Sequence, residues 1–206
     1  MVMNSESSVL IRALEDLDER LYKLYKGKIA TIELNVVGGF ALMMNNVRID
    51  PSEITDIDYI GESFNSDIKK IIDEVGVKHN IGKGWINNDV LLDGSSLEDL
   101  EFIVGKLNFK KKLELKVFKI NICRPEDIVR MKLIAIDTSV MTVSKHEDFS
   151  RERDFYDIKR LMDFLNWNLQ DIKNEGEDYV MMPETFTLIE EFIKTGKNKL
   201  IETGKI

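Results

Sequence analysis

The sequence has few of the residues that cross-link a chain, bind metals or interrupt secondary structure, namely cysteine, histidine and proline. Cys123 is its only cysteine, so no disulfide can form within the chain, and its two histidines form no Cys/His cluster of the kind that binds zinc. Only three prolines occur in 206 residues, which leaves few obligatory breaks. No apolar run approaches the roughly 18 residues of a membrane span, and the polar, acidic N-terminus is unlike a secretory signal. We therefore expect a cytoplasmic protein with no membrane partner.

Positive charge is also in deficit. The chain has 29 basic and 37 acidic residues, a net charge of −8, which argues against coating nucleic acid through bulk charge. Its 43% hydrophobic and 32% charged residues are ordinary for a globular protein. The stretch 110–124 is the local exception, with six basic residues and one acid. It predicts a solvated sheet edge protected by lysines, and an RNA-phosphate contact is the alternative.

Hydrophobic periodicity predicts a mixed α/β core over residues 1–123 and a helical region over 124–206. The expected helices cover 5–26, 40–46, 66–75 and 151–165, with two more beginning at Pro125 and Pro183. The expected strands cover 32–37, 55–60, 90–92, 102–107 and 113–122.

Two aspartates interrupt the apolar strand expected over 55–60. Because residues two apart in a strand point to the same side, Asp56 and Asp58 should share one face. Two carboxylates ~4 Å apart repel by on the order of 4 kcal/mol at an effective dielectric constant of ~20. A proton or a cation relieves that repulsion, and Mg²⁺, or Mn²⁺ in its place, prefers such oxygen ligands and retains waters and substrate phosphates. The simpler interpretation is two exposed strand residues.

Two consecutive glycines end the preceding strand and open a short helix. Gly38 and Gly39 allow a tight turn and a close approach of a ligand to the main chain. The N–H groups at a helix start favour a phosphate. A phosphate-binding turn beside a metal-binding pair would together hold a nucleoside triphosphate, whereas an ordinary turn is the alternative.

The motifs resemble a known family. "VVGGFAL", an arginine and "TDIDYI" are similar to the signature of the nucleotidyltransferase superfamily with the DNA polymerase β-type core, and most of all to its bacterial branch of AbiEii-type toxins. The matching positions are Gly38, Gly39, Ala41, Arg48, Thr55, Asp56 and Asp58. Downstream, "RPEDIVRMKLIAI" and "RERDFYDIKRLM" resemble the helices of that branch. The similarity covers roughly residues 30–165. It departs at Phe40, where many relatives carry serine or threonine, and at an inserted "IDPSE".

The resemblance implies the minimal nucleotidyltransferase fold, a small mixed sheet flanked by helices. It implies Mg²⁺-dependent transfer of a nucleoside monophosphate from a nucleoside triphosphate to a hydroxyl of RNA, protein or a small molecule. For a toxin it implies a cognate antitoxin. The implied roles are metal binding and catalysis for Asp56 and Asp58, and nucleotide binding for Gly38, Gly39, Arg48, Thr55, Lys132 and Arg151.

Three further expectations concern charged residues of less specific pattern. Lys132 lies in a helix that is apolar nearly all round, so its amine either extends along the helix to solvent or reaches the triphosphate as a catalytic cation. Asp154 and Asp157 are expected to hold basic side chains rather than a metal. Arg153 and Asp157, four residues apart, should form a surface ion pair.

Glu114 is the candidate for a third catalytic carboxylate. It is the only acid in the strand expected over 113–122, and family members that transfer nucleotides usually carry a third acid on a later strand. Neighbouring lysines favour an exposed strand end instead. Without a third acid, the alternative function is a catalytically degenerate protein of the same fold that binds a nucleotide or a partner.

Overall fold

The computed structural model describes residues 8–50, 52, 54–90, 97–142, 152–177 and 181–198. The chain divides into two compact units. The first comprises Met1–Phe102 and Leu107–Arg124, and the second comprises Ile103–Lys106 and Pro125–Ile206. The boundary expected after residue 123 lies one residue from the division at Arg124, but the short segment 103–106 was expected in the first unit.

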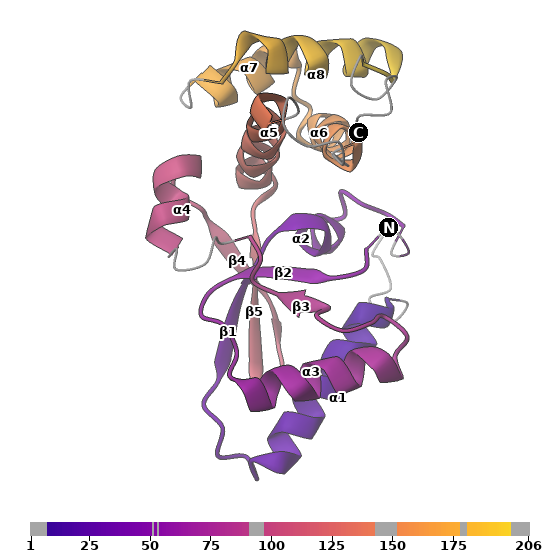
Figure 1. Ribbon diagram of the computed structural model, residues 1–206, viewed down its shortest axis with the longest axis vertical. Helices are drawn as coiled ribbons and strands as arrows, with labels where there is room; N and C mark the ends of the chain where they lie inside the picture. The colour runs from indigo at the N-terminus through magenta and orange to yellow at the C-terminus, as the bar shows by residue number, and fades with distance from the viewer. Residues whose placement is uncertain are drawn as a thin grey trace. The chain divides into compact units, whose positions relative to one another are not determined.

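A five-stranded mixed sheet, with the strand order β3-β2-β1-β5-β4, organises the described part of the first unit (Figure 1). Its strands are β1 Ile32–Val36, β2 Ile57–Ile60, β3 Ile86–Asn87, β4 Phe109–Glu114 and β5 Phe118–Cys123. β1 pairs antiparallel with β2 and parallel with β5, β2 pairs parallel with β3, and β4 closes the sheet antiparallel to β5. The expected mixed α/β class is confirmed. The basic stretch 110–124 supplies both β4, an edge strand, and β5, which lies between β1 and β4, so the predicted sheet edge is confirmed for β4 alone.

The helices α1 Val9–Leu24, α2 Gly38–Met44 and α3 Ser66–Lys78 belong to this unit. α1 has an apolar stripe because its leucines recur every three or four residues, and four of them, Leu10, Leu14, Leu17 and Leu21, are fully buried. Leu24, expected on the same stripe, is 60% exposed. α1 and α3 pack against each other below the sheet in Figure 1. Asn65 caps α3 by accepting a hydrogen bond from Ile68 N–H at 2.9 Å.

The two faces of the sheet differ in polarity. On one face the central strands bury apolar side chains, namely Leu34, Val36, Ile57, Tyr59, Phe118, Ile120 and Ile122. On the other face Asn35, Asp58 and Asn121 are only half-buried, and the Asn121 amide donates to Asn35 Oδ1 at 3.0 Å. This alternation follows the two-residue period of a strand and gives the sheet a polar face, on which the buried Ile60 and Cys123 also lie.

The strand predicted over 113–122 is wrong, because a hairpin turns within it. β4 ends at Glu114 and β5 begins at Phe118. The turn contains no glycine or proline, and Asp18 of α1 stabilises it from outside. The buried Asp18 carboxylate accepts hydrogen bonds from the N–H groups of Lys116 at 3.0 Å, Val117 at 2.7 Å and Phe118 at 3.0 Å.

Two weaker strand predictions also fail where they can be compared. The expected strand 102–107 begins inside α4, Leu97–Val104, and Gly105 follows this helix with a φ of 73°. Of the expected strand 90–92, Val90 lies in a turn and the other two residues lie outside the described ranges. The sequence patterns did not predict β3, α4 or α7.

The second unit is helical as predicted, with α5 Pro125–Thr142, α6 Glu152–Leu165, α7 Leu169–Glu177 and α8 Pro183–Thr195. α5 packs against each of the other three. The Phe155 and Phe192 rings meet in the core with centroids 5.4 Å apart. Arg130 of α5 donates to the carbonyls of Val104 at 3.0 Å and Lys106 at 2.9 Å, which fastens the segment 103–106 to α5. Within the ranges that the structure describes, no helix is long and apolar enough to cross a bilayer.

Candidate functional site

The turn after β1 brings Gly38 against Asp58 of β2. Asp58 lies beside the end of β1, because the Val37 N–H donates to the Asp58 carbonyl at 2.9 Å. Gly38 has a φ of 64°, a conformation that side chains rarely adopt. A Cβ on Gly38 would lie 2.6 Å from Asp58 Oδ2, so the carboxylate occupies space that only glycine leaves open. The predicted neighbourhood of the Gly-Gly turn and the aspartate strand is therefore present.

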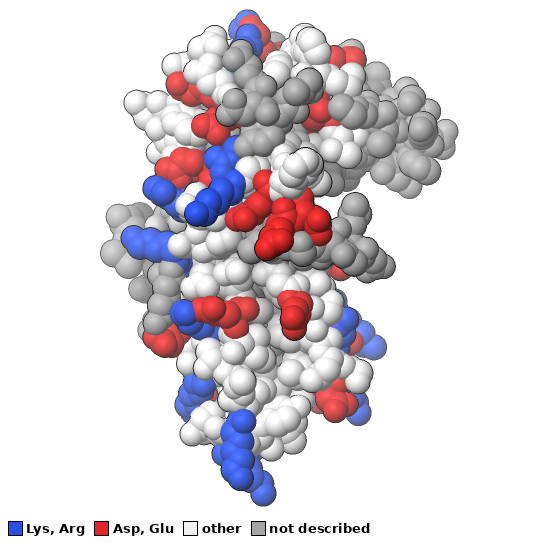
Figure 2. Space-filling view, turned by 90° about the vertical axis from the view of Figure 1, so that its left-hand side faces the viewer, with Lys and Arg blue, Asp and Glu red and all other residues white. Residues whose placement is uncertain are grey.

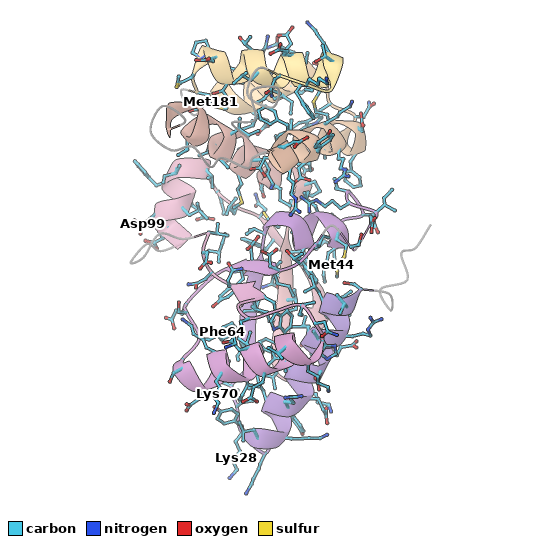
Figure 3. All side chains as sticks on the ribbon, turned by 45° about the vertical axis from the view of Figure 1, so that its right-hand side comes forward. Lys28, Met44, Phe64, Lys70, Asp99 and Met181 are labelled. Atoms are coloured by element: carbon cyan, nitrogen blue, oxygen red, sulfur yellow. The ribbon has the colours of Figure 1, made fainter. Side chains whose placement is uncertain are left out.

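The next glycine makes the same kind of room for a cation. A Cβ on Gly39 would lie 3.0 Å from Nη1 of Arg48, a side chain that is only 5% exposed. Arg48 follows α2, whose last residue, Met44, is labelled in Figure 3. Successive positions of the turn thus face a carboxylate and a guanidinium, which can donate to phosphate in a planar fork.

Asp56 and Thr55 precede β2 rather than lie within it. Ile57 and Tyr59 are buried, whereas Asp56 and Asp58 are half-buried, so the alternation predicted from the sequence holds. Thr55 is exposed. Burial raises the pKa of Tyr59, on the apolar side, to about 12. Its ring lies 5.2 Å from that of Phe64, labelled in Figure 3.

The register does not bring Glu114 to these carboxylates. Glu114 pairs with Lys119, which pairs with Glu33 in β1, whereas Asp58 lies beside Val37 at the other end of β1. Four residues separate those positions along β1, or about 13 Å, and three strand spacings add about 14 Å across the sheet. The third-carboxylate prediction is therefore wrong for Glu114, because the hairpin turns this residue to the opposite end of the sheet.

The second unit contains its own buried ion cluster. Lys132 forms an ion pair with Asp154 and lies 3.0 Å from Asp157 Oδ2. Burial alone would lower the pKa of Lys132, but the two carboxylates outweigh burial and raise it above its usual value of 10.5. The prediction that these aspartates hold basic side chains is confirmed, and the predicted Arg153 partner of Asp157 gives way to Lys132. Arg151 lies outside the described residues.

Asp56 and Asp58 fit the requirements of Mg²⁺ when a nucleotide supplies the remaining ligands. Among the described residues no three His, Cys, Asp or Glu side chains gather to form an all-protein metal site. Mg²⁺ is commonly held by one or two carboxylates together with substrate phosphates. The carboxylate oxygens of the two half-buried aspartates have the chemistry of that mode of binding, and Gly38 lets the Asp58 carboxylate lie against the turn.

On the face drawn in Figure 2, acidic and basic groups lie side by side. On the polar face of the sheet, Lys119 pairs with Glu33. The predicted RNA-phosphate contact of the basic stretch stays a prediction.

We compared the chain with protein-family models, with curated proteins and with solved structures, and none of the three comparisons gave a match.

Proposed function

We propose that this chain has the nucleotidyltransferase fold, binds Mg²⁺ and a nucleoside triphosphate at the Gly38–Gly39 turn, and transfers the nucleoside monophosphate to a hydroxyl. The observation that carries the proposal is the packing of the Asp58 carboxylate into the space left by Gly38. Gly38 allows both the positive φ of the turn and the close approach of the Asp58 carboxylate, and the proposal assigns that approach to positioning the carboxylate for a cation.

Each group at the turn has a chemical role in this proposal. Asp56 and Asp58 hold the divalent cation, which when bound supplies positive charge against the phosphate oxygens. Arg48 donates hydrogen bonds to a phosphate, and Gly39 leaves space for its guanidinium. The acceptor oxygen bonds to the α-phosphorus, the bond to pyrophosphate breaks, and the acceptor's proton leaves to solvent or to a base.

The acceptor class and the partner rest on the resemblance alone. RNA, protein and small-molecule hydroxyls stay open as acceptors, and a cognate antitoxin stays a prediction. The roles of Thr55, Lys132 and Arg151 in nucleotide binding are likewise predictions.

Nucleotide binding without transfer is the second candidate function. The position of Glu114 favours it, because the first unit loses the acid that was expected to act as base or second-metal ligand. An acceptor hydroxyl is then left without Glu114 to take its proton.

Calorimetry tests the binding step. Each nucleoside triphosphate is titrated into the protein with Mg²⁺ present, and the double variant Asp56→Asn/Asp58→Asn is expected to lose binding while its melting curve shows a folded protein. Equal affinity in the double variant would remove the site.

Labelled triphosphates test the transfer step. The protein is incubated with Mg²⁺, α-³²P-labelled nucleotides and total cell RNA, and label is sought on RNA, on protein and on small molecules. Transfer that depends on Asp56 and Asp58 supports the enzyme. Specific binding with no labelled product supports the second candidate.

A further inference from the structure

The strand β3 places a residue beside Asp58 that the sequence pattern did not single out. β2 and β3 pair in parallel, and Asn87 is the direct partner of Asp58. Partners across a sheet point to the same side, so the Asn87 side chain lies on the polar face with Asp58. Ile57 and Ile86, one residue earlier in each strand, pair with each other and are buried on the opposite face.

The Asn87 amide has the chemistry of a hard-metal ligand. Its Oδ1 accepts a hydrogen bond from Asp89 N–H at 3.0 Å, which ends β3 in a local turn and orients the amide. An amide oxygen has two lone pairs and can accept a second interaction. Amide carbonyl oxygens bind Ca²⁺ and Mg²⁺ alongside carboxylates.

We propose that Asn87 supplies a neutral third oxygen ligand to the cation held by Asp56 and Asp58, so that the cation binds tightly only when a nucleotide adds its phosphates. The inference rests on the metal site of the proposed function and adds a residue and a binding order to it. A carboxylate at position 87 would bring a third negative charge onto one small face and would retain a cation without nucleotide. The amide keeps the number of carboxylate ligands at two.

The charge count explains why an amide matters here. The affinity of a carboxylate site for hard cations rises with the number of charged ligands. Two carboxylates and one amide make a weak site for the metal alone, and triphosphate oxygens then complete it. The protein would therefore take up the metal–nucleotide complex rather than keep a resident metal.

Mn²⁺ binding measures this inference without any turnover. Free Mn²⁺ is followed by electron paramagnetic resonance with the metal alone, in the native protein and in Asn87→Asp. We expect the substitution to lower the Kd for Mn²⁺ on the order of ten-fold, because it adds a charged ligand. Asn88→Asp is the matched control with the same change of charge one residue along. The Asn88 side chain accepts a hydrogen bond from the Ser63 hydroxyl and donates one to the Gly61 carbonyl, and Asn88 is not the strand partner of Asp58. The Kd of Asn88→Asp for Mn²⁺ should therefore equal that of the native protein.

Two further variants keep each failure distinguishable. Asn87→Ala should weaken binding of the Mn²⁺–ATP complex about five-fold in calorimetry, and it decides the question if Asn87→Asp does not fold. Asp58→Asn should abolish Mn²⁺ binding both in the native protein and in Asn87→Asp. If Asp58→Asn does not bind Mn²⁺ but Asn87→Asp binds it no more tightly than the native protein, the metal site stands and the role of Asn87 is overturned. Undiminished binding in Asp58→Asn overturns the metal site itself.

Discussion

Asp18 Oδ1 accepts a hydrogen bond from Val117 N–H at 2.7 Å, joining residues 99 positions apart. With the N–H groups of Lys116 and Phe118 on the same carboxylate, the first helix fixes the turn between β4 and β5. Three donors on one buried carboxylate satisfy a turn whose own side chains offer no cap.

Replacing Asp18 should therefore destabilise the sheet. Asp18→Ala leaves three N–H groups without their acceptor, and we expect the free energy of unfolding to fall on the order of 4 kcal/mol. Urea denaturation measures the change. Glu15→Gln on the exposed side of α1 is the control and should change stability by less than about 0.5 kcal/mol. A loss below about 1 kcal/mol in Asp18→Ala would contradict the role of this carboxylate.

Gly38→Ala should disrupt the site more than the fold. Its Cβ would meet Asp58 Oδ2 at 2.6 Å, so the carboxylate must move and binding of Mg²⁺ with nucleotide should fall at least about ten-fold. Gly84 provides a matched control because it has nearly the same φ, 66°, and a methyl group there would meet no atom within 4 Å. Both variants should lose about 1 kcal/mol from backbone strain, seen in thermal unfolding. Equal nucleotide affinity in Gly38→Ala and Gly84→Ala would contradict the role of the turn.

Lys132→Met should destabilise the helical unit by about 3 kcal/mol, because the buried Asp154 and Asp157 lose the ammonium group that they share. The raised pKa of Lys132 means that its contribution is complete below pH 10.5 and is lost as the pH rises through the raised value. Denaturation at pH 8 measures it.

The triple variant Lys132→Met/Asp154→Asn/Asp157→Asn separates charge from packing. We expect it to regain much of the lost stability, because it contains no uncompensated buried charge. No recovery would show that the lysine acts through its packing alone.

Asp16 gives a stability contribution that depends on acid. Burial tends to raise its pKa, but hydrogen bonds from Lys78 at 2.8 Å and His79 at 3.1 Å, with the charge of Arg20, outweigh burial and lower it. The link between α1 and α3 therefore stabilises the protein above pH 3.8, the ordinary value, and is lost as the pH falls through the lowered pKa.

Asp16→Asn should accordingly reduce the free energy of unfolding by about 1 kcal/mol at pH 7. The difference from the native protein should shrink in acid, when the native carboxylate is also neutral. Glu74→Gln, on the exposed side of α3, should show no such pH dependence. A constant difference at every pH would exclude the charge of Asp16 as its cause.

Strong local patterns carried most of the correct sequence predictions. The leucine period of α1 and the alternation around Asp56 and Asp58 are direct consequences of which face is buried, so they could be recognised without partners. The approach of Gly38 to Asp58 could be predicted because the turn and the next strand are close in sequence.

The failures lie where structure depends on distant residues. The hairpin after Glu114 has no turn residue of its own, because Asp18 supplies what glycine or proline would otherwise supply. The exposure of Phe102, 92%, removes the apolar pattern from which a strand was inferred. β3 has two residues and no periodicity, so Asn87 could be found only from its pairing with Asp58.

The hydrogen bonds from Arg130 to the carbonyls of Val104 and Lys106 affect how the two units could be separated by recombination. Residues Ile103–Lys106 belong to the helical unit, although in the sequence they lie between the two segments of the sheet unit. Recombination at residue 124 would give a chain that contains α5 but lacks the carbonyls that Arg130 binds. The other product would contain residues 103–106 without Arg130. We therefore expect the two units to be inherited together and not exchanged separately between proteins.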